Sequence, residues 1–128
     1  MSDLPLALEI LLQTREAAER ILARFEPVGS ASYFLDSEEG LEKLDAICMQ
    51  LIALGESLKN LDKVAGPEFL ERYPQIDWKS AKGMRDIISH HYFDLDAEAV
   101  FDVCKVNIPE MIPVLTQMIA DVRSAEGK

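Results

Sequence analysis

The sequence predicts an all-α protein, an up-and-down bundle of about five helices. Apolar residues recur every three or four positions over most of the chain, strand-like alternation is almost absent, and helix-capping residues precede the apolar stretches. At 128 residues the chain has the length of one domain. We therefore expect a single helical domain over residues 1–128, with a polar tail at about 124–128.

The first two expected helices cover the N-terminal half of the chain. Pro5 suits the first turn of a helix over residues 5–25, and Pro27 and Gly29 end that segment. A second helix is expected to begin at Asp36 as its N-cap, with Glu39 three residues later as in a capping box. Its apolar residues form a seam with steps of three and four residues, in which Gly55 fills one place: Leu41, Leu44, Cys48, Leu51 and Leu58.

Gly55 is expected to mark a close approach between helices. Glycine inside a helix costs about 1 kcal/mol relative to alanine, so a tight helix crossing is the favoured explanation over a functional one. After a short helical segment within residues 66–74, Asp77 is expected to cap a third helix that ends near residues 90–94. We expect Trp78 to anchor the core or a dimer interface rather than to stack on a base.

Two more helices complete the expected bundle. Asp96 caps the fourth, and the fifth restarts at Asn107, with a kink or an irregular first turn expected at Pro113. The two cysteines, Cys48 and Cys104, lie in apolar helical patterns and are expected to be buried thiols in a reducing compartment. Four methionines at helical core spacing are assigned to packing: Met49, Met84, Met111 and Met118.

The charge balance narrows the possible partners. Acidic residues outnumber basic ones 23 to 13, for a net charge of −10, so the chain lacks the basic surplus that broad nucleic-acid binding needs. A nucleic-acid contact would have to be a small local site. The chain starts without a basic region before its apolar residues and has no apolar run of about 20 residues. We therefore expect a cytoplasmic protein without a signal peptide or membrane partner.

One segment concentrates side chains suited to chemistry: Arg85-Asp86-Ile87-Ile88-Ser89-His90-His91-Tyr92. In a regular helix Arg85 shares a face with Ser89 and Tyr92, whereas His90 lies about 140° away from Arg85. Asp86 is four residues before His90 and could orient one imidazole nitrogen. A histidine for proton transfer beside an arginine for phosphate suits metal-free RNA cleavage. From spacing alone, a hydrogen-bonded helix end is the more common explanation.

The same segment does not predict a metal site. His90 and His91 are neighbours, and neighbours on a helix point about 100° apart, so they cannot chelate one metal ion in a regular helix. No glycine-rich phosphate loop, paired-cysteine motif or zinc-protease motif occurs in the sequence. We expect neither metal nor cofactor.

The segment Arg85-(four residues)-His90-x-Tyr92 resembles the R-x4-H-x-Y motif of the HEPN superfamily, specifically of its HepT-like toxins. Further matches follow in the order typical of that family: Leu54-Gly55-Glu56-Ser57-Leu58, Ile76-Asp77-Trp78 with Gly83-Met84-Arg85, Tyr92-Phe93-Asp94-Leu95-Asp96, Val100-Phe101-Asp102 and Ile108-Pro109. The resemblance covers about residues 6–122. An R-x4-H spacing is common by chance, whereas the ordered set is much more specific.

The resemblance implies a HEPN-like helical bundle that forms a homodimer and places two Arg/His motifs across a shared cleft. Family members are metal-independent endoribonuclease toxins, so RNA is the implied substrate, with tRNA among the candidates. The resemblance assigns His90 as general acid/base and Arg85 as the residue that stabilises charge in the transition state. Attack by the ribose 2′-OH would leave a cyclic phosphate.

The resemblance also implies a partner and a means of control. HepT-like toxins are encoded beside a minimal nucleotidyltransferase (MNT) antitoxin, which transfers AMP to the motif tyrosine and silences the nuclease. Tyr92 is then the modification site and a candidate for positioning RNA. Ser89 shares the motif face, and Glu56 is either a partner of Arg85 in the site or part of a surface or interhelix salt bridge.

The sequence departs from the family pattern at two positions. Asp86 stands where HepT-like proteins often have asparagine; its carboxylate would raise the pKa of His90 and also repel phosphate. His91 stands where an acidic residue is expected, and it either offsets local negative charge or, as we favour, caps the helix. Lys79, Lys82 and Arg85 could form a basic island for RNA, and a solvated charged face is an equal alternative.

Two other functions remain open. A catalytically silent HEPN subunit would bind the nucleotidyltransferase or a small nucleotide without cutting RNA. A helical scaffold would use the motif only to cap a helix. The apolar stripes exceed what one small core needs, which also favours a two-fold dimer.

Overall fold

The computed structural model describes residues 3–127, and every regular element in that range is helical. The all-α prediction is therefore confirmed. Four helices are long and three are short, in this order: α1 (Leu4–Phe25), α2 (Tyr33–Asp36), α3 (Glu38–Ala65), α4 (Glu68–Glu71), α5 (Trp78–His91), α6 (Ala97–Asp102) and α7 (Ile108–Glu126). A 3-10 turn (Tyr92–Asp94) follows α5, and a π-helical turn (Val103–Asn107) joins α6 to α7.

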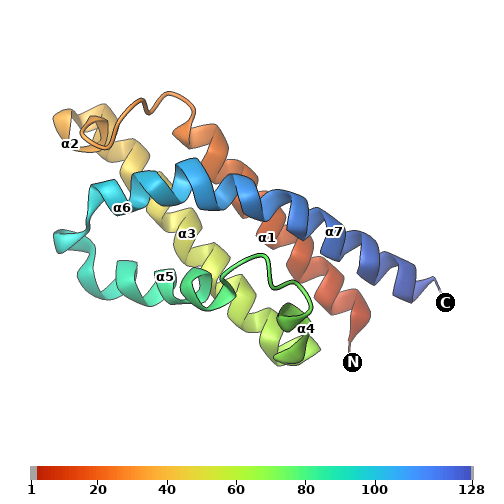
Figure 1. Ribbon diagram of the computed structural model, residues 1–128. Coiled ribbons are helices and arrows are strands. Elements are labelled where there is room, and N and C mark those ends of the chain that lie inside the picture. The colour runs from red at the N-terminus through yellow and green to blue at the C-terminus, as the bar shows by residue number, and fades with distance from the viewer. Residues whose placement is uncertain (1–2, 128) are drawn as a thin grey trace.

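Helices α1, α3 and α7 form the core of the bundle. In Figure 1, α1 runs beside both α3 and α7. Each of the three helices contributes apolar side chains that are fully buried, among them Leu11, Ile21, Ile47, Leu58 and Leu115. Burying a side chain of this size contributes about 1.5–3 kcal/mol, so this three-helix unit holds the fold together.

Helix α5 is attached to this core from one side. It packs against α3 and makes no comparable contact with α1 or α7, and Figure 1 shows it at the edge of the molecule, apart from α7. Of its 14 residues, Trp78 and Ile88 are the buried ones. The helix that carries the Arg/His motif therefore depends on a single supporting helix.

Gly55 allows α5 to approach α3 closely. A Cβ atom at Gly55 would lie 3.0 Å from the Cβ of Arg85 and 3.3 Å from the carbonyl oxygens of Ala81 and Lys82. These distances are shorter than ordinary van der Waals contact. The tight crossing predicted at Gly55 is confirmed, and its partner is the helix that carries the motif.

Side-chain caps start the helices near the expected positions, with one correction. Asp77 accepts a hydrogen bond from the Ser80 N–H at 3.1 Å, and Asp96 caps α6, as predicted. The N-cap of α3 is Ser37, which accepts from the Gly40 N–H at 3.1 Å. Asp36, the predicted cap, ends the short helix α2 instead, because the chain is already helical before the cap is reached.

The irregularity expected at Pro113 lies earlier in the chain. Pro113 sits inside α7, whereas the π-helical turn covers Val103–Asn107, where the Ile108 N–H bonds the Val103 carbonyl five residues back. Pro109 has no N–H, so the regular ladder is already interrupted there. The predicted fourth and fifth helices are consequently joined by this turn. At the C-terminal end, a polar tail was predicted at residues 124–128, but α7 continues as a helix to Glu126. Lys128 lies outside the described residues.

Burial confirms most of the predicted core and corrects two assignments. Cys48 and Cys104 are free and buried, and burial raises the pKa of both thiols to about 12. Trp78 is buried and its indole N–H donates to the Tyr73 carbonyl at 2.8 Å, so it is a core residue. Met49 is 63% exposed and Leu41 36% exposed, because both lie on the face of α3 that points away from the core, although Met49 lies between buried Cys48 and Leu51 along the chain. No described helix is long and apolar enough to cross a membrane.

Candidate functional site

The motif segment lies in the last two turns of α5 and the 3-10 turn that follows. Helix α5 is regular through His91, and Tyr92 begins the 3-10 turn. Arg85 is partly buried, whereas Ser89, His90 and His91 are exposed. The site is thus an exposed surface at the C-terminal end of the peripheral helix α5.

Two carboxylates hold the guanidinium of Arg85. Its Nε donates to Glu56 Oε2 at 2.8 Å, and its Nη1 donates to Asp86 Oδ1 at 2.9 Å. The hydrogen bond that Arg85 donates to Asp86, and then the negative charge of Glu56, raise the pKa of Arg85. Glu56 therefore forms an interhelix salt bridge, and its partner is the motif arginine, so the two alternatives considered for it coincide. A guanidinium has five N–H donors, so these two contacts do not use all of its capacity to bind an anion.

Both carboxylate oxygens of Asp86 accept hydrogen bonds from cationic side chains. Its Oδ1 accepts from Arg85 and its Oδ2 accepts from the ammonium of Lys59 at 3.2 Å. These two hydrogen bonds lower the pKa of Asp86, with Arg85 the larger cause. No hydrogen bond joins Asp86 to His90 in the described chain, so the expected orientation of the imidazole by this carboxylate is absent here.

Tyr92 is tied to α3 as well. Its hydroxyl donates to Asp45 Oδ1, and its ring meets the ring of Phe93 edge to face at 6.2 Å between centroids. Tyr92 is 36% exposed and Phe93 is fully exposed. The hydroxyl is accordingly positioned at the surface, beside a carboxylate that can accept its proton.

One stripe of α3 supplies all of these contacts. Asp45, Glu56 and Lys59 hold Tyr92, Arg85 and Asp86 respectively. They are separated by 11 and 3 residues, which in an α-helix places them on one face. The sequence reasoning did not identify Asp45 and Lys59 as site residues. Their helical spacing relative to Glu56 was the signal that could have found them.

The structure does not bring His90 and Arg85 together within one chain. Because α5 is regular, the two side chains stay about 140° apart around its axis. His90 and His91 make no hydrogen bond or ion pair with another described residue. No group of three His, Cys, Asp or Glu side chains within residues 3–127 is placed to hold a metal ion.

Acidic neighbours pair with two of the three side chains of the predicted basic island, whereas Lys79 is exposed and has no ion pair within the described residues. Lys82 forms a 2.6 Å ion pair with Asp62, and Arg85 is paired with Glu56 and Asp86. An anion that binds at Lys82 or Arg85 must therefore compete with these carboxylates.

Fold and site together define a class of protein, a helical bundle that presents an R-x4-H-x-Y set at the exposed end of a peripheral helix. Residues 14–118 match the protein family described as "Ribonuclease HepT-like". This range covers most of the chain, so the chain belongs to the HepT-like ribonuclease family. The resemblance inferred from the motif is confirmed.

Individual relatives agree with this assignment. Two proteins of Methanocaldococcus jannaschii, named "Putative RNase MJ0127" and "Putative RNase MJ1216", are 31% and 36% identical over 81 residues, which is 63% of this chain and 64% and 60% of theirs. "Probable ribonuclease HepT" of Thermococcus cleftensis is 30% identical over 66 residues, covering 52% of this chain and 56% of that protein. The chain thus spans less than two thirds of the length of these relatives. No solved structure matches the chain.

Proposed function

We propose that this protein is a metal-independent endoribonuclease in which His90 transfers protons and Arg85 binds the reacting phosphate. The observation that carries the proposal is the fixed guanidinium of Arg85, held at 2.8 Å by Glu56, on the same helix as an exposed histidine. A guanidinium offers paired N–H donors that fit a phosphate, and histidine changes charge near neutral pH. Membership of a ribonuclease family and relatives named as RNases support this chemistry.

The reaction is an internal transfer at phosphorus. The ribose 2′-oxygen loses its proton to a base, attacks the adjacent phosphorus and expels the 5′-oxygen, which takes up a proton. The products are a 2′,3′-cyclic phosphate and a 5′-hydroxyl end. His90 serves as the acid/base group, and Arg85 stabilises the additional negative charge on the phosphorane-like transition state. The phosphate binds this guanidinium, and substrate displaces Asp86 from Nη1.

A homodimer supplies the geometry that one chain lacks. His90 and Arg85 point about 140° apart on α5, so we propose that two copies of this helix face one another and combine an Arg85 from one protomer with a His90 from the other. Apolar side chains are exposed on and next to α5, namely Ile87 at 51% and Phe93 at 100%. Exposed apolar residues of this size around a polar site are typical of an interface. Light scattering at micromolar concentration should report twice the chain mass.

We further propose that the nuclease is the toxin of a toxin–antitoxin pair and that an MNT antitoxin silences it at Tyr92. The Tyr92 oxygen would attack the α-phosphorus of ATP and release pyrophosphate, while its proton passes to Asp45, its hydrogen-bond acceptor. The resulting phosphodiester adds negative charge and bulk beside His90, which blocks RNA. Intact mass after incubation with an MNT enzyme and ATP should rise by one AMP group in the parent and stay constant in Tyr92→Phe.

The decisive experiment is RNA cleavage by the purified protein in EDTA. The substrates are total RNA and tRNA, and the variants are His90→Ala and, as a control, Glu19→Ala, an exposed position on α1. We expect cleavage by the parent and the control, with cyclic or 3′-phosphate ends. His90→Ala should lose about 10²–10⁴-fold, the usual contribution of a general acid or base.

A silent binding subunit is the alternative function. The ion pairs at Arg85 favour this alternative. Glu56 and Asp86 already bind the guanidinium that a phosphate would need, and Lys59 already binds Asp86. No cleavage by parent or variants, with Tyr92 shown by intact mass to be unmodified, would establish this alternative against the nuclease.

A further inference from the structure

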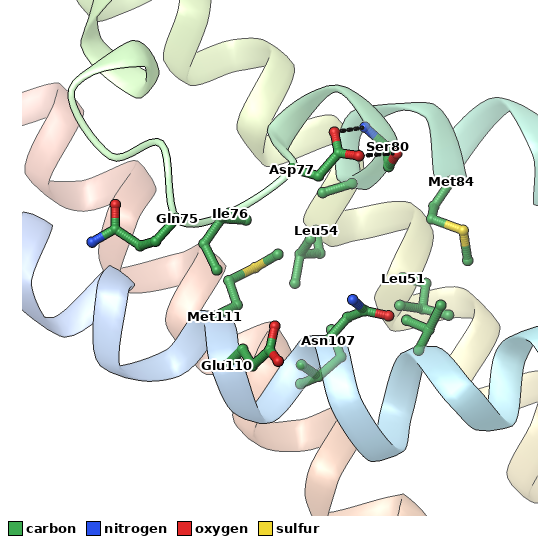
Figure 2. Close-up of a pocket in the computed structure, with 13 residues that line it drawn as sticks. Leu51, Leu54, Gln75, Ile76, Asp77, Ser80, Met84, Asn107, Glu110 and Met111 are labelled. Atoms are coloured by element: carbon green, nitrogen blue, oxygen red, sulfur yellow. Dashed lines mark hydrogen bonds between the residues drawn. The ribbon is translucent and has the colours of Figure 1, made fainter.

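A pocket opens between α5, α3 and the π-helical turn that leads into α7 (Figure 2). Its volume is about 390 Å³, which is within the range of small-molecule sites. Leu51, Leu54, Met84 and Met111 make its floor and walls apolar. The pocket lies on the opposite flank of α5 from the contacts of Arg85, so it is separate from the motif site.

Two exposed polar side chains, which have no partner among the described residues, lie at the mouth of this apolar space. Figure 2 shows Asn107, the last residue of the π-helical turn, and Glu110, in the first turn of α7, on the side of the pocket across from Leu54. Neither side chain has a hydrogen bond or ion pair within the described residues. Asp77 and Ser80 also line the pocket, but they bond one another at 2.7 Å. The amide of Asn107 and the carboxylate of Glu110 are therefore the groups that a ligand would meet.

The π-helical turn explains why Asn107 faces the pocket. In this turn the Ile108 N–H bonds the carbonyl of Val103, five residues earlier, instead of the carbonyl four residues earlier. The turn therefore contains one extra residue, and the extra residue changes the direction of the side chains that follow it. Insertions of this kind lie frequently at functional sites. Asn107 and Glu110 are three residues apart, so they project from one face of the chain.

The lining defines the chemistry of the ligand. A flat apolar group of nucleobase size fits between the leucine and methionine side chains, and an asparagine amide can pair with the amino group and ring nitrogen of adenine. Glu110 accepts hydrogen bonds only and selects a ligand with N–H donors. No lysine or arginine lines the pocket, so a phosphate finds no cation there.

We propose that this pocket binds the adenine base of a nucleoside or of an RNA strand, with Asn107 and Glu110 reading the amino edge of the base. Recognition is of the uncharged base and not of a phosphate. A ligand that touches both α5 and α7 would join two helices that otherwise lack substantial contact, and it would brace the helix that carries Arg85.

The test uses the chain's single tryptophan. Trp78 is buried and adjoins Asp77 in the pocket wall, so its emission, excited at 295 nm, reports binding nearby. The probes are adenosine, inosine and AMP for the free ligand, and a non-cleavable 2′-O-methyl oligoadenylate for the strand. Asn107→Ala and Glu110→Gln change the two polar side chains at the mouth of the pocket and are called the rim variants. Glu98→Gln is the matched control, since Glu98 is exposed on α6 outside the pocket. Calorimetry repeats the measurement independently of fluorescence.

We expect saturable binding of adenosine, weaker for inosine by about tenfold because the amino group is lost. AMP should bind no more tightly than adenosine, because no lysine or arginine lines the pocket to receive its phosphate. Both rim variants should weaken binding about tenfold or more, and Glu98→Gln should not. Tighter binding of the oligoadenylate than of adenosine would identify a strand as the source, and the reverse a free nucleoside.

The proposal is overturned if none of the probes saturates, if inosine binds as well as adenosine, if AMP binds more tightly than adenosine, or if the rim variants bind like the parent. RNA cleavage is not part of this readout. Binding can therefore succeed in a protein without nuclease activity, and it can fail in an active nuclease, so the two proposals stand or fall separately.

Discussion

The three-helix core and the peripheral helix α5 are built on different principles. Helices α1, α3 and α7 bury apolar side chains against one another, whereas α5 buries Trp78 and Ile88. Besides partly buried Ala81 and Met84, α5 is linked to α3 by ion pairs, from Glu56 to Arg85, Lys59 to Asp86 and Asp62 to Lys82. Just after α5, Tyr92 bonds Asp45 of α3. Burial at the core carries the stability, and partly exposed ion pairs, which contribute little to stability, orient the motif.

This difference indicates how a small protein can keep a polar site without weakening its fold. Exposed ion pairs cost little to rearrange, so substrate can replace one of them at Arg85. A buried charge in the core would carry a far larger penalty. The predictions below test whether stability and site geometry are separable in this way.

The largest expected effect is on stability, at the core. Leu115 is fully buried on α7, and Leu115→Ala should lower the free energy of unfolding by about 2–5 kcal/mol because it leaves a cavity. Ile88→Ala on α5 should cost less, since that helix packs on one neighbour and can settle into the space. Urea denaturation measures both. A greater loss for Ile88→Ala than for Leu115→Ala would contradict the separation of the two regions.

A smaller effect is expected where the two regions touch. Gly55→Ala places a Cβ 3.0 Å from the Cβ of Arg85, so α5 must shift by a few tenths of an ångström. The gain in helix propensity, about 1 kcal/mol, offsets the strain, and we expect little net change in stability. RNA cleavage should fall about tenfold because Arg85 moves.

Gly83→Ala is the matched control for this change. Gly83 lies on α5, and a Cβ there would have nothing within 4 Å. This variant should gain up to about 1 kcal/mol of stability and keep its cleavage rate. Equal rates for Gly55→Ala and Gly83→Ala would show that the close crossing does not position Arg85.

Tyr73 links the start of α5 to the core and predicts a pH effect. Its hydroxyl donates to Asp121 on α7 at 2.6 Å, and its carbonyl accepts from Trp78. Burial, and then the bond to Asp121, raise the pKa of Tyr73 to about 12. Because the folded pKa exceeds the unfolded value near 10, this contribution to stability is complete below pH 10 and disappears between pH 10 and 12.

Thermal melting between pH 9 and 12 checks this prediction. The parent should lose stability above pH 10 more steeply than Tyr73→Phe, which has no hydroxyl to ionise. Parallel curves for the two proteins would exclude Tyr73 as the titrating link.

The smallest expected effect on stability is at the ion pair itself. Glu56→Gln keeps the shape of the Glu56 side chain and removes its charge, and both partners are partly exposed, so unfolding should change by less than about 0.5 kcal/mol. Cleavage should nevertheless fall several-fold, with the loss mainly in kcat, because Arg85 is held less firmly. A loss confined to stability would place Glu56 outside the site.

Several features of the site were predictable from the sequence because they are local. The caps at Asp77 and Asp96 act within three residues, and the close approach at Gly55 follows from a glycine within a helical seam. The cap of α3 was placed one residue too early, at Asp36 instead of Ser37, because two adjacent residues can both serve as N-caps. Met49 was assigned to the core by its spacing, yet it lies on an uncovered part of α3.

The sequence by itself determined the helical class, the family and the identity of the motif residues, since periodicity, capping and motif order depend on neighbours along the chain. Only the tertiary structure decided which partners those residues have. Asp86 bonds Lys59, 27 residues away, instead of His90, and Tyr92 bonds Asp45 across 47 residues. Such choices depend on how α5 is rotated and aligned on α3, and they are set by packing of whole helices at Gly55 rather than by any local preference.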